Sequence, residues 1–126
     1  MPTARRSAWA PDRGEVIWID CNPQAGLEMR DLHPFLVLSP RAFNDRTSLV
    51  VGLPMTTASY NADNPFALAA GPAGGRSRGR TSYVLCHQPK SFDWRVRGGK
   101  PHPQRAVVPE VLQRACALLN QIIDLA

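Results

Sequence analysis

The sequence has no long hydrophobic run. No stretch approaches the roughly 20 consecutive apolar residues of a membrane-spanning helix. The segment from Met1 to Trp9 contains Arg5 and Arg6, but no apolar region follows them as it would in a secretory signal peptide. We therefore expect a soluble, unsecreted protein without a membrane segment. Its 126 residues suit a single domain with one core.

Cysteines are few, and carboxylates do not cluster. The three cysteines, Cys21, Cys86 and Cys116, are widely spaced and form no C-x-x-C pair, so the sequence favours neither a disulfide framework nor a zinc site. The chain also lacks the dense carboxylate cluster that holds two metal ions in many nucleases. We expect no metal and no other cofactor, and free thiols fit a reducing cytoplasm.

Acidic residues are scarce in the second half of the chain. Residues 1–63 hold six Lys and Arg against seven Asp and Glu, whereas residues 64–126 hold nine against three. Tyr83, Phe92 and Trp94 are interleaved with most of these cations, a pattern typical of proteins that bind single-stranded nucleic acid. A basic surface that only keeps the protein soluble is the alternative. The cations between Gly71 and Arg105 are Arg76, Arg78, Arg80, Lys90, Arg95, Arg97, Lys100 and Arg105.

Hydrophobic alternation and turn residues predict a small β domain. We expect strands at 15–20, 34–38, 48–58, 66–70 and 81–86. Pro54 should lie at a sheet edge or a strand end, because proline cannot donate a ladder hydrogen bond. Ser39 is expected to cap a short helical turn over 40–44, followed by a turn at 45–47. The Gly- and Arg-rich segment from Gly71 to Gly79 reads as a mobile loop.

The C-terminal segment predicts one helix from Pro109 onwards, because its apolar residues recur on a single helical face. These residues are Val111, Leu112, Ala115, Leu118, Leu119, Ile122 and Ile123. Several short strands followed by one helix indicate a mainly β fold, a small barrel or rolled sheet. We expect residues 1–13 to form a mobile lead and residues 14–126 to form the domain, with Trp18 and Phe35 in its core.

A polar loop precedes the strand at 34–38, and it carries Glu28, Arg30 and His33. Pro34 restricts His33 to extended geometry, so the imidazole should project from the start of the strand. Thr56 is expected at the end of another strand. Acid, base, cation and hydroxyl groups would then converge on strand ends.

Six short blocks follow one another along the chain: Gly14-Glu-Val-Ile-Trp-Ile-Asp20, Gly26-x-Glu28, His33-Pro-Phe-Leu-Val-Leu-Ser-Pro40, Asn44, Leu53-Pro-Met-Thr56 and Lys90-Ser-Phe-Asp-Trp-Arg95. Together they resemble the successive blocks of the MazF and PemK toxins of bacterial toxin–antitoxin modules. The resemblance covers the chain from Gly14 to Leu125. It implies an SH3-like β barrel with a C-terminal helix, a homodimer, and a metal-independent, sequence-specific endoribonuclease neutralised by an antitoxin protein.

The resemblance also implies residue roles. The catalytic threonine of the family corresponds to Thr56, and its acidic loop residue corresponds to Glu28. The family's catalytic arginine stands before the proline of the second strand, and His33 occupies that position here. Histidine titrates between about pH 5 and 8 and cannot replace a permanently charged guanidinium, so Arg30 is the candidate for the fixed charge. The residue before Gln88, usually acidic, is His87.

This set of residue types suits cleavage of RNA by its own 2′-hydroxyl. Such a reaction needs proton transfer and charge stabilisation, but no serine or cysteine nucleophile and no metal, and it leaves a 2′,3′-cyclic phosphate. His33, Thr56, Arg30 and Glu28 are therefore the candidate catalytic residues. The candidate RNA-binding residues are Lys90, Ser91, Trp94, Arg95, Arg97, Arg76, Arg78, Arg80, Asn44 and Gln88.

Other interpretations remain open at this point. The barrel could have lost catalysis and only bind RNA or the antitoxin, or it could inhibit DNA gyrase, because CcdB toxins resemble this fold. Thr56 could simply bond its own backbone at a strand end. Glu28 and Arg30 could form a surface ion pair worth at most about 1 kcal/mol.

Overall fold

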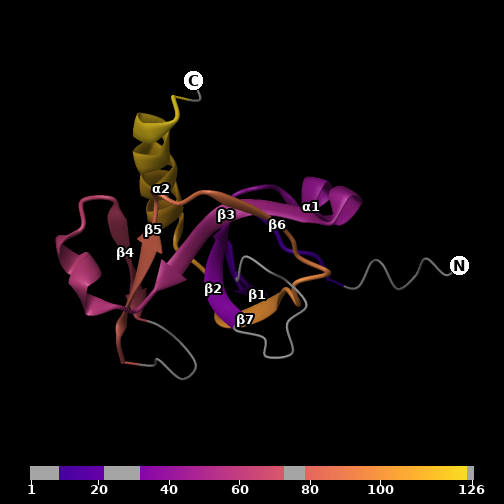
Figure 1. Ribbon diagram of the computed structural model, residues 1–126, viewed down its shortest axis with the longest axis horizontal. Helices are drawn as coiled ribbons and strands as arrows, with labels where there is room; N and C mark the ends of the chain where they lie inside the picture. The colour runs from indigo at the N-terminus through magenta and orange to yellow at the C-terminus, as the bar shows by residue number, and fades with distance from the viewer. Residues whose placement is uncertain (1–8, 22–31, 73–78, 125–126) are drawn as a thin grey trace, which may run out of the picture.

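A computed structural model describes residues 9–21, 32–72 and 79–124 (Figure 1). Each strand expected from the sequence is confirmed, with ends that differ by a few residues. The elements are β1 (Glu15–Asp20), β2 (Leu32–Val37), α1 (Arg41–Thr47), β3 (Leu49–Thr56), the 3-10 helix η2 (Ser59–Asp63), β4 (Ala67–Pro72), β5 (Thr81–Leu85), β6 (Lys90–Asp93), β7 (Lys100–Ala106) and α2 (Pro109–Ile122).

The seven strands pair antiparallel in the order β4-β5-β3-β2-β1-β7, and β6 pairs with β3. In Figure 1, β3 runs through the middle of the molecule, with β4 and β5 on one side and β2, β1 and β7 on the other. This curved sheet with one C-terminal helix is the small β barrel that the sequence predicted. No helix in the described ranges is long and apolar enough to cross a membrane.

The prediction that Pro54 lies at a sheet edge or strand end is wrong. Pro54 lies inside β3, opposite Phe35 of β2. On the other side of β3, the pairs with β6 end at Gly52 and the pairs with β5 begin at Met55. The chain therefore tolerates a proline in a central strand, because it stands where β3 passes from one partner strand to the next.

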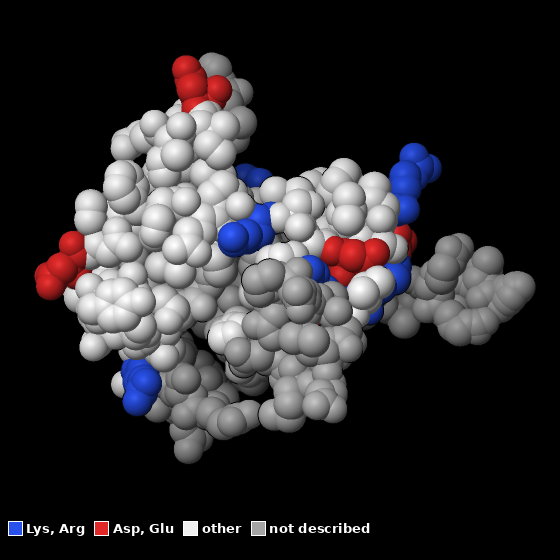
Figure 2. All heavy atoms as spheres, in the orientation of Figure 1, with Lys and Arg blue, Asp and Glu red and all other residues white. Residues whose placement is uncertain are grey.

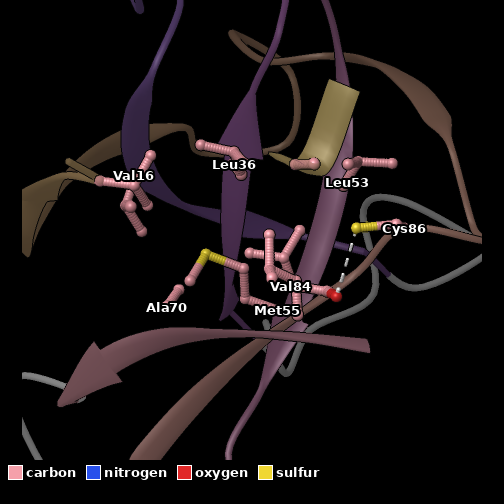
Figure 3. Packing of buried hydrophobic residues seen from close by; sticks show 10 residues of the cluster. Val16, Leu36, Leu53, Met55, Ala70, Val84 and Cys86 are labelled. Carbon is pink, nitrogen blue, oxygen red and sulfur yellow. Dashed lines mark hydrogen bonds between the residues drawn. The ribbon is translucent and has the colours of Figure 1, made fainter. Parts of the chain in front are cut away.

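One core cluster lies between the sheet and α2 (Figure 3). Ala115 of α2 belongs to this cluster and Leu119 is also buried, whereas Ile122 and Ile123 at the end of the predicted face are exposed. Pro109 occupies the first turn of the helix, where its missing N–H has no intrahelical acceptor to lose. The strand residues of the cluster are Val16, Leu36, Leu53, Met55, Leu68, Ala70 and Val84, with Cys86 just after β5.

A second cluster covers the opposite face of β1 and β2. It contains Ile17, Ile19, Phe35, Val37, Val50 and Trp94, together with Ala10. Trp9 meets Trp94 edge to face, with ring centroids 5.4 Å apart. Residues 9–13 therefore belong to the packed domain. The mobile lead predicted for residues 1–13 is wrong over these five positions, and residues 1–8 lie outside the described ranges.

The close approach of β2 and β3 requires a glycine at position 52. A Cβ atom built there would lie 2.0 Å from the Leu36 carbonyl oxygen and 2.7 Å from the Phe35 ring. Both distances are far below van der Waals contact, so any side chain would push the two strands apart. Trp18, expected in the core, is only half-buried, whereas Phe35 is completely buried.

The segment at 39–48 differs from its prediction. Helix α1 continues through the turn expected at 45–47, and Pro40 occupies its N-cap position without a side-chain cap. The Ser39 hydroxyl instead donates to Asn44 Oδ1 at 2.6 Å. Ser48 ends the helix with φ at +64° and donates its N–H to the Asn44 carbonyl. Strands β6 and β7 were not predicted from the sequence.

Candidate active site

The start of β2 and the end of β3 meet at one end of the barrel. His33 is the second residue of β2 and is exposed, and Thr56 is the last residue of β3 and is half-buried. The antiparallel register pairs Phe35 with Pro54. This pairing ends there, so His33 and Thr56 each lie two residues beyond it, at the neighbouring ends of β2 and β3. Both residues thus stand at ends of adjacent strands, as the sequence predicted.

The Thr56 hydroxyl oxygen accepts the backbone N–H of Ala58 at 3.1 Å. This bond is the one expected if Thr56 only bonds to nearby backbone at the end of its strand. A hydroxyl has one proton and two acceptor lone pairs, so accepting this bond leaves its proton available as a donor. The bond also holds the Thr56 oxygen in position, which favours a role of this hydroxyl as a positioned hydrogen-bond donor to a ligand.

Tyr83 is a third residue of this site, and the list of candidate site residues omitted it. It pairs directly with Thr56 on the side of β3 that faces β5, and it is half-buried. Tyr83 and Thr56 therefore share a face. The alternation of β5 already placed Thr81 and Tyr83 on one face. Only the β3–β5 pairing brings that face to Thr56.

Two predicted catalytic residues, Glu28 and Arg30, lie outside the described ranges. Their roles remain predictions from the sequence. Among the described residues, no group of three or more His, Cys, Asp or Glu side chains could hold a metal ion.

Trp94 is not an exposed platform for RNA bases. Its side chain is 5% exposed, and the indole N–H donates to the Asn44 carbonyl oxygen at 2.9 Å. The prediction that Trp94 binds RNA is corrected by this burial, because a base cannot stack on a ring that the core covers.

Asn44 was also predicted to bind RNA, and the structure buries it completely. Its amide donates to the carbonyl oxygens of Pro11 at 2.8 Å and Ser39 at 2.9 Å, and its oxygen accepts from the Ser39 hydroxyl. A side chain with these partners has no free group for a nucleotide. Asn44 fastens the N-terminal segment to α1.

Arg95 and Arg97 are held within the protein. The Arg95 guanidinium forms an ion pair with Asp45 at 2.8 Å, and the Arg97 guanidinium donates to the Asp20 carbonyl oxygen at 3.0 Å. Arg97 also lies over the Phe92 ring, with its Cζ 4.7 Å from the ring centroid. Both arginines thus have structural partners, and their predicted phosphate contacts would compete with these.

The other described RNA-binding candidates, Lys90, Ser91, Gln88 and Arg80, are exposed. Arg76 and Arg78 lie outside the described ranges. His87 is exposed beside Gln88, with ring nitrogen and amide 3.4 Å apart. On the face in Figure 2, the Lys and Arg side chains lie singly, and some lie next to Asp or Glu. The described residues on that face form no continuous basic stripe.

Burial shifts the pKa of two groups away from the candidate site. It lowers the pKa of His102, which stacks on Trp18 with centroids 4.3 Å apart. The ring nitrogen Nδ1 of His102 accepts the backbone N–H of Gln104, a bond that needs this nitrogen unprotonated. Burial, with Cys116 nearby, raises the pKa of Cys86 to about 11, so this thiol stays protonated and unreactive.

Fold and site together define a small β-barrel protein with acid–base and hydroxyl groups on adjacent strand ends. The chain belongs to the family of PemK-like, MazF-like toxins of type II toxin–antitoxin systems, which it matches over residues 12–123. The resemblance found in the sequence is thereby confirmed.

Curated relatives cover nearly the whole chain. A protein named endoribonuclease toxin MazF, from Escherichia coli strain K12, is 34% identical over 117 residues, which cover 93% of this chain and 97% of the relative. Endoribonuclease PemK from Escherichia coli is 34% identical over 112 residues, which cover 86% of this chain and 82% of the relative.

Solved structures agree with the fold. The crystal structure of MazF from Deinococcus radiodurans superposes with a TM-score of 0.73 at 29% identity, covering 93% of this chain and 99% of that one. A MazE–MazF crystal structure from the same organism gives a TM-score of 0.72 at 26% identity, with the same coverage.

Proposed function

We propose that this protein is an endoribonuclease toxin that cleaves single-stranded RNA, such as mRNA, at specific sequences and without a metal ion. The observation that carries the proposal is the 34% identity, over 93% of the chain, to a relative named endoribonuclease toxin MazF. A cognate antitoxin protein neutralises it, a role supported by the similarity to a MazE–MazF complex. The protein acts in the cytoplasm, where its substrate is made.

The reaction uses a nucleophile that RNA supplies. A base removes the proton of a 2′-hydroxyl, the 2′ oxygen bonds to the adjacent phosphorus, and the bond from phosphorus to the 5′ oxygen breaks. An acid protonates the departing oxygen. The products are a 2′,3′-cyclic phosphate and a 5′-hydroxyl end. Proton transfer and stabilisation of the phosphorane charge are the tasks left to the protein.

His33 and Thr56 are the described residues suited to these tasks. The imidazole of His33 is exposed at the start of β2, and an imidazole can act as a general acid or base. The Thr56 hydroxyl, fixed by the Ala58 N–H, can donate to a non-bridging phosphate oxygen. On the resemblance alone, Glu28 supplies a second acid or base and Arg30 a permanent positive charge.

RNA is held by the exposed basic and polar residues beyond this pair. Lys90 and Arg80 remain as phosphate contacts, with Ser91 and Gln88 as hydrogen-bonding groups. The protein acts as a homodimer, which would join two such surfaces and cover sheet edges that are otherwise exposed at β4 and β7. Sedimentation at micromolar concentration tests the dimer, and a lone 13.9 kDa species would contradict it.

The test of the activity is turnover of single-stranded RNA by the purified protein in the presence of a chelator. Products ending in a 2′,3′-cyclic phosphate are expected. A matched RNA with hydrogen in place of the 2′-hydroxyl at the cut site should resist cleavage. Cutting of that substrate, or loss of activity with the chelator, would contradict the mechanism.

The same assay separates the other two functions. A barrel that only binds RNA protects it and does not shorten it. A gyrase inhibitor blocks DNA supercoiling and leaves RNA intact. Identity to two relatives named as endoribonucleases supports the cleaving function over both.

A further inference from the structure

A cavity of about 640 Å³ lies beside Thr57 and Ala58, the two residues that follow Thr56. Its size lies within the range of about 300–1,000 Å³ typical of small-molecule sites. The segment after β3, η2 and the start of β5 form its walls. The lining residues are Thr57, Ala58, Ser59, Tyr60, Arg80, Thr81 and Tyr83.

Two connections tie this cavity to the candidate catalytic hydroxyl. Thr57 follows Thr56 directly, and Ala58 donates the N–H that fixes the Thr56 oxygen. Tyr83 is the residue paired with Thr56 across β3 and β5. A phosphate at Thr56 would therefore have the cavity next to it, within reach of the neighbouring nucleotide.

The lining chemistry fits a nucleotide. Among the described residues, the lining includes two tyrosines, three residues with hydroxyl groups (Thr57, Ser59 and Thr81) and one arginine, and none of these lining residues is acidic. Arg80 is exposed, and no described residue forms an ion pair with it. Aromatic rings stack on bases, and an uncompensated arginine attracts a phosphate.

Tyr60 is the most unusual feature of this cavity, because 79% of it is exposed. Hydrogen bonds of the next residue hold the turn that carries it. The next residue, Asn61, is buried, and both its backbone N–H and its side-chain amide donate to the Ala58 carbonyl oxygen at 3.1 Å. Asn64 donates to the Asn61 side-chain oxygen at 3.3 Å. A rigid turn thus holds a large ring towards solvent, ready to stack on a ligand.

We propose that this cavity is the subsite for the nucleotide next to the cleaved phosphodiester. The base stacks on Tyr60 and Tyr83, the backbone phosphate on its far side binds Arg80, and the hydroxyl groups of the lining contact the base edge. This inference rests on the proposed function for the statement that Thr56 binds the cleaved phosphate. It assigns sequence preference at one nucleotide position to the cavity.

Binding without cleavage tests the subsite. The probes are short single-stranded RNAs, 2′-O-methylated throughout so that they cannot be cut, with one abasic nucleotide moved along the sequence. For the wild type, the abasic nucleotide should weaken binding about 5- to 150-fold at one position, the effect of a lost base stack. Tyr60→Ala should weaken binding of the intact RNA similarly, and the abasic nucleotide should then cost nothing more.

Non-additive losses in Tyr60→Ala and the abasic RNA identify the stack, because independent changes would add. Tyr60→Phe keeps the ring and should bind as the wild type does. Phe43→Ala is the matched control, because it removes another exposed aromatic side chain from α1, on the far side of β3 (Figure 1). Strictly additive losses, or an equal loss in Phe43→Ala, would overturn the subsite.

Failure of the subsite and failure of the proposed function give different results. A wild type that fails to cut RNA but shows the Tyr60 coupling would overturn the nuclease and keep the nucleotide site. A wild type that cuts RNA, with the same KM and the same cleavage sequences in Tyr60→Ala, would keep the nuclease and overturn the subsite.

Discussion

Arg95 lies over the ring of Trp94, with its Cζ 4.2 Å from the ring centroid. The same guanidinium donates to Asp45 Oδ1 at 2.8 Å and to the Ser48 hydroxyl at 2.6 Å. The two residues therefore tie the turn after β6 to α1. This relationship explains why a basic and aromatic sequence block does not present its ring and its charge to RNA.

Replacing Arg95 should affect stability more than RNA binding. Arg95→Ala should lower the free energy of unfolding by about 1–2 kcal/mol, the sum of a cation–π contact and a surface ion pair. The log–log salt slope of RNA binding should stay as in the wild type. Lys90→Ala removes an exposed cation for comparison and should lower the magnitude of this salt slope by about 0.7. If Arg95→Ala lowered the magnitude of the salt slope as much as Lys90→Ala does, Arg95 would be a phosphate contact after all.

His33 should be needed for turnover. His33→Ala is expected to lower kcat/KM by roughly 10²- to 10⁴-fold, the usual contribution of a general acid or base. His33→Arg introduces the guanidinium that the resemblance to the toxin family implies at this position, so activity should recover. Wild-type turnover in His33→Ala would make His33 structural.

The Thr56 hydroxyl should contribute as a donor to the phosphate. Thr56→Val keeps the shape but lacks the hydroxyl, so kcat should fall by about 10²- to 10³-fold, whereas Thr56→Ser should keep most of the activity. Thr47→Val is the matched control, because Thr47 also accepts a backbone N–H two residues on, from Leu49 at 3.0 Å. Equal losses in both valine variants would indicate a fold defect.

Stability should fall in mild acid because of His102. Burial lowers its folded pKa below the ordinary 6.5, so the unfolded chain takes up a proton first as the pH falls. The contribution of His102 to the free energy of unfolding is complete above about pH 6.5. As the pH falls from there to the pKa of His102 in the folded protein, this contribution is lost by up to about 1.4 kcal/mol per pH unit. Denaturant titrations across this range measure the slope.

His102→Asn is the matched variant for this effect. Its side-chain oxygen can accept the Gln104 N–H in place of Nδ1, but it does not titrate. The slope of the free energy of unfolding against pH below about pH 6.5 should therefore fall by the contribution of about one proton. An unchanged slope would assign the acid sensitivity to other groups.

Asn44 should matter for folding and not for RNA. Asn44→Ala leaves two carbonyl oxygens and the Ser39 hydroxyl without their partner, so the free energy of unfolding should fall by about 3 kcal/mol. The fraction that stays folded should bind RNA with wild-type affinity. A selective loss of RNA binding at unchanged stability would contradict this.

The sequence by itself determined the local structure and the family. Short apolar runs bounded by turn residues predicted the strands, because successive side chains of a strand point to opposite faces of the sheet. The helical period of α2 was equally clear. The ordered blocks from Gly14 to Arg95 identified the family, and they placed His33 and Thr56 at strand ends before any pairing was known.

Two strands escaped prediction for a local reason. Strand β7 contains Pro101 and Pro103, and prolines normally argue against a strand. The two prolines are tolerated because β7 is an edge strand of the sheet. Strand β6 has only four residues, too few for a clear alternation. Pro54 was expected at a sheet edge or strand end but lies inside β3. The strand tolerates it because Pro54 lies between the residues of β3 that pair with β6 and those that pair with β5.

Only the tertiary structure decided which polar and aromatic groups are available to a ligand. Arg95 and Asp45 are 50 positions apart in the chain, as are Trp94 and Asn44, so no local pattern could show that they bind each other. The pairing of Tyr83 with Thr56 has the same character. Sequence sets the face on which a side chain lies, but contacts between distant segments determine whether that side chain is satisfied by the protein or left for RNA.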